Sequence, residues 1–576
     1  MESLNPMSGL QAERPDFLEH NWRALGRCQP DLVRRLEAGA SQEHLTPAEG
    51  GKTTLAWRGA EVALDLEGPA REGVVRELDR PAAGTSGETL LFGLGLGETL
   101  ETALVRNAAP ILAWERDPAL LLATLSRVDV ADALENARVR FVLGTDLLDR
   151  CRGRRPASVR AHPVLGTVYA RERVLVEKGA HGTAVALAEG RLFVDQVGEC
   201  LRRLGYDPFT VDLRLLSLDE LDHQLEVLDP HFLFEINHLP GTPEFCAARG
   251  LPYVAWEIDP STDRVAPATA PIGDARIFTY RQAHVSEYHA AGYAKVVHTP
   301  LAADVEARRP SSPVDPDRES FASEVSFVGA SMVARAKACR AEFSALVRSW
   351  AQRVGAEIED FDERLDSILI EQRELPFDYR IPALLRESFG DFLDDHERRA
   401  AAGEVLVRPE SLVGEIAASD KRLGLLAGIS RYTPQVWGDA GWRSLSSEGI
   451  RYRGGAGHVH DLNRVYSNAE INLDIGRIYQ SDIVTMRVFD VLACGGFALV
   501  EHSDDLERLF EVGVELDSYR SSEELDAKLE HWLAHPEERR AVAARGRAAV
   551  IERHSMEGRL SEMLVDLGPR ATQAAG

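Results

Sequence analysis

The chain has 576 residues, of which 44% are hydrophobic and 27% are charged, and its formal net charge is -26. A chain of this length is too long for one hydrophobic core and predicts several domains. The acidic balance excludes a general nucleic-acid binder and a protein drawn to anionic membranes, although it is compatible with a local basic pocket for a phosphorylated ligand.

No stretch approaches the ~20 apolar residues that a transmembrane helix needs. The N-terminal segment MESLNPMSGLQAERPDFLEHNW is polar and acidic, so we do not expect it to be a signal peptide. The six cysteines lie far apart without paired spacing, which predicts reduced thiols rather than a disulfide framework or a zinc site. We therefore expect a cytoplasmic protein with no transmembrane segment and no nucleic-acid partner.

Residues 1–165 are predicted to form a first Rossmann-like domain. A polar helical opening and a small β segment, TTLAWRGAEVALDLE, precede the strand, glycine turn and helix of TLLFGLGLGETLETALV. The turn contains Gly93, Gly95 and Gly97. The next strand, PILAWERDP, ends near Glu115, at about the distance downstream where an acid holds a ribose.

This glycine turn has two interpretations. Glycines let the backbone approach a ligand, and the start of the helix favours anions, so the turn with Glu115 is a candidate N-terminal ligand site. The GxGxG spacing fits an S-adenosylmethionine-type fold better than a nicotinamide-binding one. Alternatively, the turn binds nothing and its glycines serve only tight packing. The absence of an acid-aromatic motif of the kind that amino-methyltransferases use argues against methyl transfer.

Residues 166–305 are predicted to form a second domain with parallel strands and crossover helices. The expected strands are RVLVEKG, FTVDL, HFLFEIN, PYVAWEIDP, RIFTY and KVVHTPL. His238 and Asp259 each follow a strand, where side chains reach the ligand crevice of α/β folds. Either could orient or deprotonate an acceptor hydroxyl. The alternatives are an ordinary loop histidine and a turn-forming aspartate before Pro260.

Residues 306–576 are predicted to form a third domain, which opens with the strand EVSFVGA. A long charged helical insertion follows at about residues 335–425. The domain then resumes with TPQVWG, IRYRGG, AEINLDI, a helix–strand unit and GVELD, and it closes with helices rich in Glu, Arg and Ala.

The helix–strand unit, SDIVTMRVFDVLACGGFALV, carries charges in an otherwise apolar run. Asp482 is expected before or at the helix start, and Arg487 and Asp490 lie three residues apart on one face. Taken alone, Asp482 is interpreted as a helix cap, and Arg487 and Asp490 as a surface ion pair of little energetic value.

The order of these residues resembles a known signature. Asp482 and Asp490, eight positions apart, resemble the Glu-x7-Glu motif of retaining GT-B glycosyltransferases, with aspartates in place of both glutamates. The segment from YSNAEINLDI to the C-terminal helices resembles the CgeB-like glycosyltransferases. The matching positions are Tyr466, Asn472, Arg487, Asp490, Gly495 and Gly496. Upstream, VSFVGASMVAR (Gly329, Arg335), FLFEIN, GLPYVAWEIDP and HTPLAAD also resemble that family, whose members often lack the first acid.

The first domain resembles the N-terminal domain of Maf-type flagellin glycosylation proteins. The resemblance is carried by LLFGLGLGETLETAL, ILAWERDP and the later His162-Pro163. It implies an accessory domain that recognises a protein acceptor, which could be flagellin-like, or that organises an assembly.

Together the resemblances imply an α/β fold with a GT-B core of two facing Rossmann-like domains after an additional N-terminal one. Residues 166–305 would be the acceptor side and residues 306–576 the nucleotide-sugar side. The implied donor-binding residues are Gly329, Asn472, Arg487, Asp490, Gly495 and Gly496. The candidate catalytic residues are His238, Asp259, Arg335 and Asp482.

No metal ion is expected to take part. The acid pairs Asp360-x-Asp362 and Asp315-x-Asp317 lie in a charged helical region and in a linker, not at a strand end. Departure of the diphosphate would then depend on backbone amides, a helix dipole and the cations Arg487 and Arg335. Either arginine could instead be a structural ion-pair partner.

The sequence therefore predicts a glycosyltransferase that moves a sugar from a nucleotide-sugar to a protein or glycan acceptor. The nucleotide-sugar is a co-substrate, and no other cofactor is expected. Resemblance to the acid-x7-acid signature implies a retaining outcome. Two alternatives remain: a non-catalytic nucleotide-sugar or partner-binding scaffold, and a methyltransferase that acts through the first domain.

Overall fold

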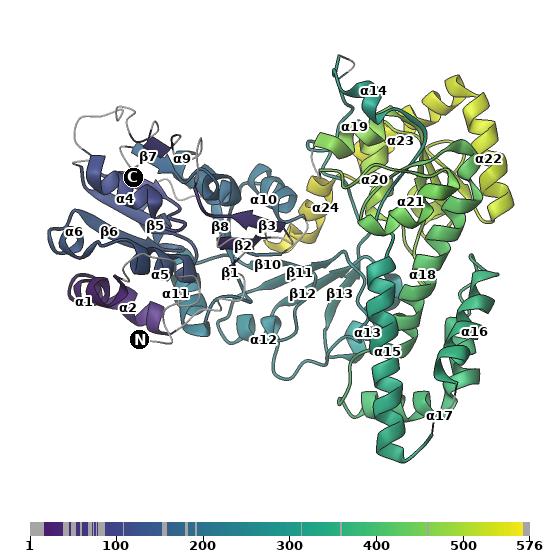
Figure 1. The fold of residues 1–576 in the computed structure, drawn as a ribbon, viewed down its shortest axis with the longest axis horizontal. Coiled ribbons are helices and arrows are strands. Elements are labelled where there is room, and N and C mark those ends of the chain that lie inside the picture. The colour runs from purple at the N-terminus through teal and green to yellow at the C-terminus, as the bar shows by residue number, and fades with distance from the viewer. Residues whose placement is uncertain are drawn as a thin grey trace. The chain divides into compact units, whose positions relative to one another are not determined.

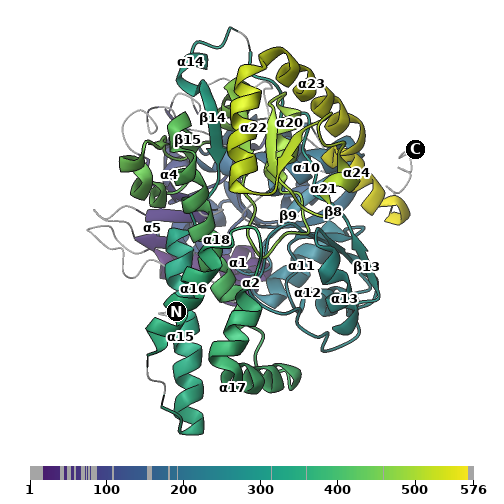
Figure 2. The ribbon, with the colours of Figure 1, turned by 90° about the vertical axis from the view of Figure 1, so that its right-hand side faces the viewer.

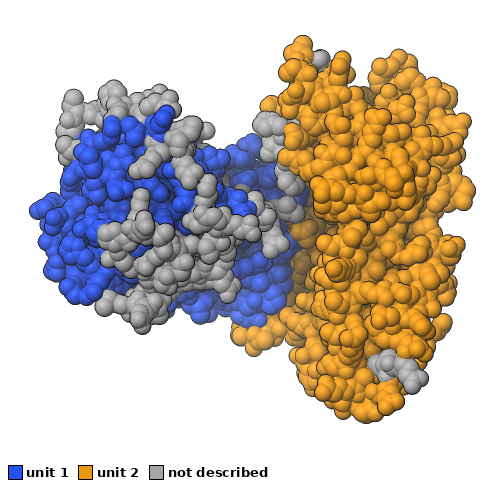
Figure 3. Space-filling view, viewed as in Figure 1, with its two compact units in different colours: residues 1–255, 564–576 blue, residues 256–563 orange. Residues whose placement is uncertain are grey.

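The computed structural model describes residues 17–38, 45–47, 53–57, 60–66, 72, 74–75, 78, 87–106, 109–151, 158–178, 182–190, 193–312, 314–357, 360–457 and 460–567. The chain divides into two compact units (Figure 3), which comprise residues 1–255 with 564–576 and residues 256–563.

The first sheet consists of four parallel strands in the order β6-β5-β4-β7 (Figure 1). Leu91 of β4 packs with the cluster of α1 and α2, whereas Leu90 and Phe92 pack with the cluster that includes Tyr169. Both faces are therefore covered, which explains why these strands read as continuous apolar runs. The elements are α1 (Leu18–Cys28), α2 (Pro30–Glu37), β4 (Thr89–Phe92), α4 (Glu98–Arg106), β5 (Ile111–Glu115), α5 (Pro118–Arg127), α6 (Ala131–Glu135), β6 (Val139–Leu143), α7 (Asp146–Cys151) and β7 (Ser158–Ala161).

A small antiparallel sheet precedes the first sheet in the sequence. It consists of β1 (Leu45–Pro47), β2 (Thr53–Trp57) and β3 (Ala60–Ala63), and β2 pairs with β3 across a tight connection. The predicted β segment at TTLAWRGAEVALDLE is therefore present.

The second sheet has six strands in the order β9-β8-β10-β11-β12-β13, and the division into units falls within β11. Its elements are β8 (Thr183–Ala188), α10 (Val194–Arg203), β9 (Tyr206–Val211), α11 (Leu218–Leu228), β10 (Leu233–Ile236), α12 (Thr242–Ala247), β11 (Tyr253–Glu257), β12 (Ala275–Thr279), α13 (Gln282–Ala290) and β13 (Lys295–His298). Along the chain, the strand order reverses between β8 and β10.

One predicted strand of this region is wrong. The segment RVLVEKG belongs to helix α9 (Ala170–Lys178), and the strand that the prediction missed is β8. A short apolar run does not by itself distinguish a buried strand from a helix. Here Glu172, Leu175 and Val176 are all buried, and their i, i+3, i+4 spacing is that of one helix face.

The third sheet is parallel throughout, with the order β16-β15-β14-β17-β18-β19. This is the doubly wound order in which the chain moves outward from β14 and then returns to β17 on the other side, so that the ligand crevice is expected at the carboxyl ends of β14 and β17. The strands are β14 (Ser323–Val328), β15 (Gln435–Trp437), β16 (Arg451–Tyr452), β17 (Ala469–Asp474), β18 (Ala498–Glu501) and β19 (Asp517–Tyr519). The helices after the insertion are α19 (His460–Asn468), α20 (Met486–Ala493), α21 (Leu506–Leu509), α22 (Ser522–Ala534), α23 (Pro536–Arg553) and α24 (Met556–Met563).

The predicted insertion between β14 and β15 consists of four helices, α15 (Val333–Val354), α16 (Phe361–Arg373), α17 (Ile381–Ala401) and α18 (Pro409–Gly428). They enclose their own apolar core, in which Phe343 contacts Phe361, Phe389 and Phe392. Helix α15 packs along α18 (Figure 2). The insertion therefore has an internal reason to be stable.

The predicted fold class is confirmed: the chain is α/β, with the two Rossmann-like sheets of a GT-B core after an additional N-terminal one. The finer domain boundaries stay a prediction. None of the described helices combines the length and the apolar character that a bilayer-spanning segment requires.

Candidate functional site

The carboxyl edge of the third sheet holds a buried arginine at the point where the strand order reverses. Arg487, in the first turn of α20, donates to the carbonyl of Val328 and to the carboxylate of Asp474, at the ends of β14 and β17. Its guanidinium carbon lies 4.6 Å from the ring centroid of Phe327. A Cβ at Gly329 would lie 2.7 Å from Nη2 of Arg487, so the glycine makes room for the arginine.

A second buried arginine, Arg422, reaches the same edge from α18. Its Nη1 donates to the carbonyl of Ala330 at 2.9 Å, and its Nη2 donates to the carbonyl of Ile475 at 3.3 Å. Its Nε has no hydrogen-bond partner among the described residues. Burial, together with the nearby charges of Arg487 and Arg477, lowers the pKa of Arg422 to about 9. The site therefore holds more positive charge than its own acids neutralise around this group.

The neighbouring charges show the same excess. Lys421 pairs with Glu501, and Arg487 pairs with Asp474. Nε of Arg477 lies 4.0 Å from the carboxylate of Glu415, and within the described ranges it has no hydrogen-bond partner. The group thus consists of four cations and three acids, namely Lys421, Arg422, Arg477, Arg487, Glu415, Asp474 and Glu501. An anion entering this edge would meet uncompensated N–H donors.

The two acids of the acid-x7-acid pattern take separate arginine partners. Asp482 lies in the loop before α20 and accepts from Arg281, with a shortest distance of 2.8 Å to Nη2. Asp490 lies within α20 and pairs with Arg308 at 3.0 Å, and both side chains are buried. Arg487 and Asp490, expected on one helix face, therefore contact different charges.

Asn472, Gly495 and Gly496 have local packing roles. Asn472 accepts from Ser326 Oγ at 2.8 Å and donates to the carbonyl of Tyr466 at 3.1 Å, which ties β17 to β14 and α19. A Cβ at Gly496 would lie 2.6 Å from the amide nitrogen of Asn472, and Gly495 has a φ of 73° where α20 ends. Both glycines precede β18 and so lie at its amino end.

The remaining candidates on the acceptor side are spread out. Arg335 is exposed in the first turn of α15, and its nearest hydrogen bond is a weak one of 3.4 Å to Thr262. Asp259 is exposed in the loop after β11. His238 is half-buried after β10, and its Nδ1 lies 3.1 Å from the hydroxyl of Tyr253.

In the first domain, the turn glycines have φ values of 79°, 58° and 97°, which are typical of glycine. The fully buried Glu115 accepts from the backbone amide of Leu94 at 2.8 Å and from the hydroxyl of Tyr169 at 2.8 Å. A Cβ at Gly95 would lie 2.6 Å from Nε2 of His162. The chain's own side chains thus occupy the turn, an arrangement that favours the packing interpretation of these glycines.

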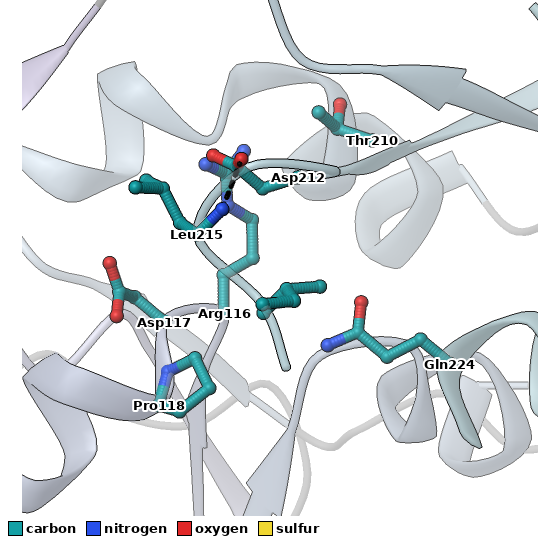
Figure 4. Close-up of a pocket in the computed structure, with 8 residues that line it drawn as sticks. Arg116, Asp117, Pro118, Thr210, Asp212, Leu215 and Gln224 are labelled. Carbon is teal, nitrogen blue, oxygen red and sulfur yellow. Dashed lines mark hydrogen bonds between the residues drawn. The ribbon is translucent and has the colours of Figure 1, made fainter. Parts of the chain in front are cut away.

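A polar pocket lies beside this domain, within the first unit (Figure 4). Arg116 and Asp117 line it after β5, and Thr210 and Asp212 line it at the end of β9. Its free space is small, with room of about 20 Å³ for the centres of water-sized molecules. Arg116 lies 3.4 Å from Glu189 and 3.7 Å from Glu172, so this arginine is already surrounded by acids. We interpret the pocket as a structural polar junction.

Across the described ranges, no group of three or more His, Cys, Asp or Glu side chains is arranged to hold a metal ion. Of the two acid pairs with DxD spacing, Asp315 binds Arg464 at 2.7 Å and Asp362 binds Arg340 at 3.2 Å. Neither pair ends a strand of the third sheet.

Residues 421–565 match a family model described as glycosyl transferase-like. This quarter of the chain contains strands β15 to β19, Arg422 and Arg487. The match assigns sugar transfer to this part of the chain, which is therefore an enzyme of the glycosyltransferase class. No curated protein matches the chain.

Several solved structures are weakly similar. Sucrose-phosphate synthase from Thermosynechococcus elongatus is 10% identical, with a TM-score of 0.38 over 66% of this chain and 97% of that one. HepE from Anabaena, in complex with UDP and glucose, is 10% identical, with a TM-score of 0.35 over 67% and 100%. The MAf glycosyltransferase from Magnetospirillum magneticum AMB-1 is 13% identical, with a TM-score of 0.20 over 46% and 63%. TM-scores this low carry no structural argument.

The sequence analysis missed four charged members of this region: Arg281, Arg422, Asp474 and Arg477. Asp474 ends the strand AEINLD, and Arg281 follows the strand RIFTY, so the strand-end rule that identified Asp259 also applies to them. The signal for Arg422 is weaker. It is a basic pair with Lys421 inside the apolar helix segment IAASDKRLGLLAG.

Proposed function

We propose that the chain transfers a sugar from a nucleotide-sugar to a protein or glycan acceptor, and that the carboxyl edge of β14 and β17 holds the donor diphosphate. The observation that supports this most is the buried excess of positive charge there, with N–H groups of Arg422 and Arg477 that lack partners among the described residues. Buried charges are normally paired, so this excess favours an anionic ligand.

In the proposed reaction, the bond between the anomeric carbon and the diphosphate breaks and leaves negative charge on the nucleoside diphosphate. Fixed cations in a poorly solvated site stabilise such developing charge strongly. Arg422 and Arg487 are held by backbone carbonyls and by Asp474, so they are already oriented before the donor arrives. We therefore propose transfer without a divalent metal ion.

The donor-binding roles of Gly329, Asn472, Arg487, Asp490, Gly495 and Gly496, and the catalytic roles of Asp259, Arg335 and Asp482, remain part of this proposal. The structure supports Gly329 and Arg487 most directly. Retention of configuration rests on the acid-x7-acid resemblance, and the pairing of Asp482 with Arg281 gives it no independent support.

Residues 1–165 are proposed as an accessory domain of a cytoplasmic enzyme, and its resemblance to flagellin-modifying proteins suggests that it recognises a protein acceptor. A methyltransferase role has less support, because Glu115 already engages the backbone amide of Leu94 in the glycine turn. Calorimetry with S-adenosylmethionine tests this alternative, and tight binding with methyl transfer would make the protein bifunctional.

The main test is calorimetric titration of the whole chain with a panel of nucleoside diphosphates. Arg477→Met removes a half-buried cation that has no hydrogen-bonded partner at Nε, and should weaken the cognate ligand about tenfold, since a charge-assisted hydrogen bond contributes about 1.5–3 kcal/mol. Arg431→Met is the matched control, because Arg431 is exposed and pairs with Asp526. Unchanged affinity in Arg477→Met would place the diphosphate elsewhere.

Binding alone does not distinguish an enzyme from a scaffold. Release of nucleoside diphosphate from the cognate nucleotide-sugar, measured with and without acceptor, makes that distinction. A chain that binds the nucleotide tightly and releases none from the sugar nucleotide would be the non-catalytic scaffold.

A further inference from the structure

A hydrogen-bonded chain of three side chains lies at the carboxyl edge of the second sheet, within the first unit. The strand order of this sheet reverses between β8 and β10, and His238 follows β10 directly. In open α/β sheets, the crevice at such a reversal is where ligands bind. His238 is therefore at the position on this sheet where a bound group is expected.

The chain of hydrogen bonds sets the orientation of the imidazole. The hydroxyl of Tyr253, on β11, donates to the carboxylate of Glu235, on β10. With its proton directed to Glu235, the tyrosine oxygen accepts from Nδ1 of His238 at 3.1 Å. A proton on Nδ1 leaves a lone pair on Nε2, so the arrangement selects the tautomer whose outer nitrogen is a base.

The backbone next to His238 is strained. Asn237 has a φ of 62°, in the left-handed region that few residues other than glycine adopt. Glu235 also accepts from the backbone amide of Leu239 at 3.2 Å, which holds the turn in this form. Strained residues of this kind are concentrated at functional sites, because the surrounding structure must stabilise them.

The inner end of the chain is buried and acidic. Glu235 is 5% exposed, and burial raises its pKa to about 7 against the opposing effects of Tyr253, the Leu239 amide and Arg214. The other titratable group that faces it is the thiol of Cys246 on α12, whose pKa burial raises to about 12. Glu235 is therefore the group of this chain that changes charge near neutral pH.

We propose that His238 is the base that deprotonates the acceptor hydroxyl, with Tyr253 and Glu235 as its positioning residues; this inference rests on the proposed glycosyltransferase function. Nε2 of His238 takes the hydroxyl proton while the acceptor oxygen bonds to the anomeric carbon. The bond from that carbon to the diphosphate breaks, and its electron pair leaves with the nucleoside diphosphate. Glu235, acting through Tyr253, offsets the positive charge that forms on the imidazole.

This step implies a stereochemical outcome opposite to the one that the sequence resemblance implies. A base that activates the acceptor for direct displacement gives a product with inverted anomeric configuration. Retention requires another route, in which a carboxylate or the leaving diphosphate takes part on the same face of the sugar. The anomeric configuration of the product therefore tests the proposal independently of any variant.

The experiment compares His238→Gln, Tyr253→Phe and Glu235→Gln in the full chain, with His531→Gln on the surface helix α22 as the control. His238→Gln should lower the rate of transfer about 100-fold, the lower range of general-base catalysis, with little change in nucleoside diphosphate affinity. Tyr253→Phe should lower kcat more than it raises KM. Glu235→Gln should remove the rise of kcat/KM through about pH 7. Proton NMR of the product should show inversion.

Wild-type transfer that survives His238→Gln, or a product with retained configuration, would overturn this inference and leave the proposed function intact. Variants of Glu235 and Tyr253 that lower the rate without altering the pH profile would make their role merely structural and would also contradict it. A wild-type chain that neither binds nor turns over any nucleotide-sugar would instead refute the proposed function itself.

Discussion

Arg487 reaches the end of β14 because residue 329 has no side chain. A Cβ at Gly329 would lie 2.7 Å from Nη2 of Arg487 and 3.1 Å from the ring of Phe327. The guanidinium fills the space that a Cβ would take, and it uses that position to bind the carbonyl of Val328. The glycine after β14 is therefore explained by the position of one cation.

Gly329→Ala should displace Arg487 and weaken the binding of nucleoside diphosphate. Overpacking of this kind costs about 1–3 kcal/mol of stability. The control is Gly424→Ala in α18, where a Cβ would meet nothing within 4 Å and the helix should gain stability. Calorimetry and thermal unfolding of both variants test the prediction. Equal nucleotide affinity in the two would separate Arg487 from ligand binding.

Asp490→Asn should lower stability as well as test the proposed ribose contact. Asp490 pairs with Arg308 at 3.0 Å, and both are buried, so the change removes the charge that balances a buried guanidinium. Removing one partner of a buried pair costs about 3–5 kcal/mol, and an asparagine that keeps one hydrogen bond should cost less.

The double variant Asp490→Asn with Arg308→Met separates these two effects. It removes both charges, so its stability should recover relative to the single variant, whereas a lost ribose contact would not recover. Nucleotide affinity that returns with stability would assign Asp490 to the fold alone.

The elements of the third sheet could be predicted from sequence because each strand is a short apolar run between turn residues. The identity of the charged partners could not. Arg487 and Asp490 share a helix face in the sequence, yet Asp474 and Arg308 bind them from 13 and 182 positions away. Arg422 was missed for the same reason, since its contacts to Ala330 and Ile475 exist only after α18 packs on the sheet.

Asp482 and Arg281 should behave as a coupled pair. Their side chains are 23% and 16% exposed and form three hydrogen bonds. Asp482→Asn and Arg281→Met should each lose a similar amount of stability, and a double-mutant cycle should give a coupling of about 1 kcal/mol. If Asp482 acts directly on the donor sugar, its variant would lose turnover far more than Arg281→Met does. Steady-state rates of both variants decide between the two roles.

Turnover of the donor should survive an excess of chelator. The positive charge at the diphosphate site comes from side chains such as Arg422 and Arg487, which chelation leaves in place. Activity assays with and without chelator, followed by addition of manganese or magnesium, check this prediction. A loss that either ion restores would show that a metal supplies part of the charge stabilisation.

Glu115→Gln should change how the stability of the first sheet depends on pH. Burial raises the pKa of Glu115 from 4.5 to about 7, so the folded state favours the protonated acid. Its contribution is fully present below pH 4.5 and is lost as pH rises through 7, by roughly 3 kcal/mol in total. His162 has the opposite slope, because burial lowers its pKa to about 4 and its contribution is lost as pH falls below 6.5.

The difference between the wild type and Glu115→Gln isolates the carboxyl group, since His162 is present in both. Native-state hydrogen exchange of the amides in β4 and β5 measures this difference locally, which a global melt of a multidomain chain does not. The stability of the variant relative to the wild type should rise by roughly 3 kcal/mol between pH 4.5 and 8. A constant offset across that range would mean that Glu115 is ionised throughout, with the amide of Leu94 and the hydroxyl of Tyr169 outweighing the effect of burial.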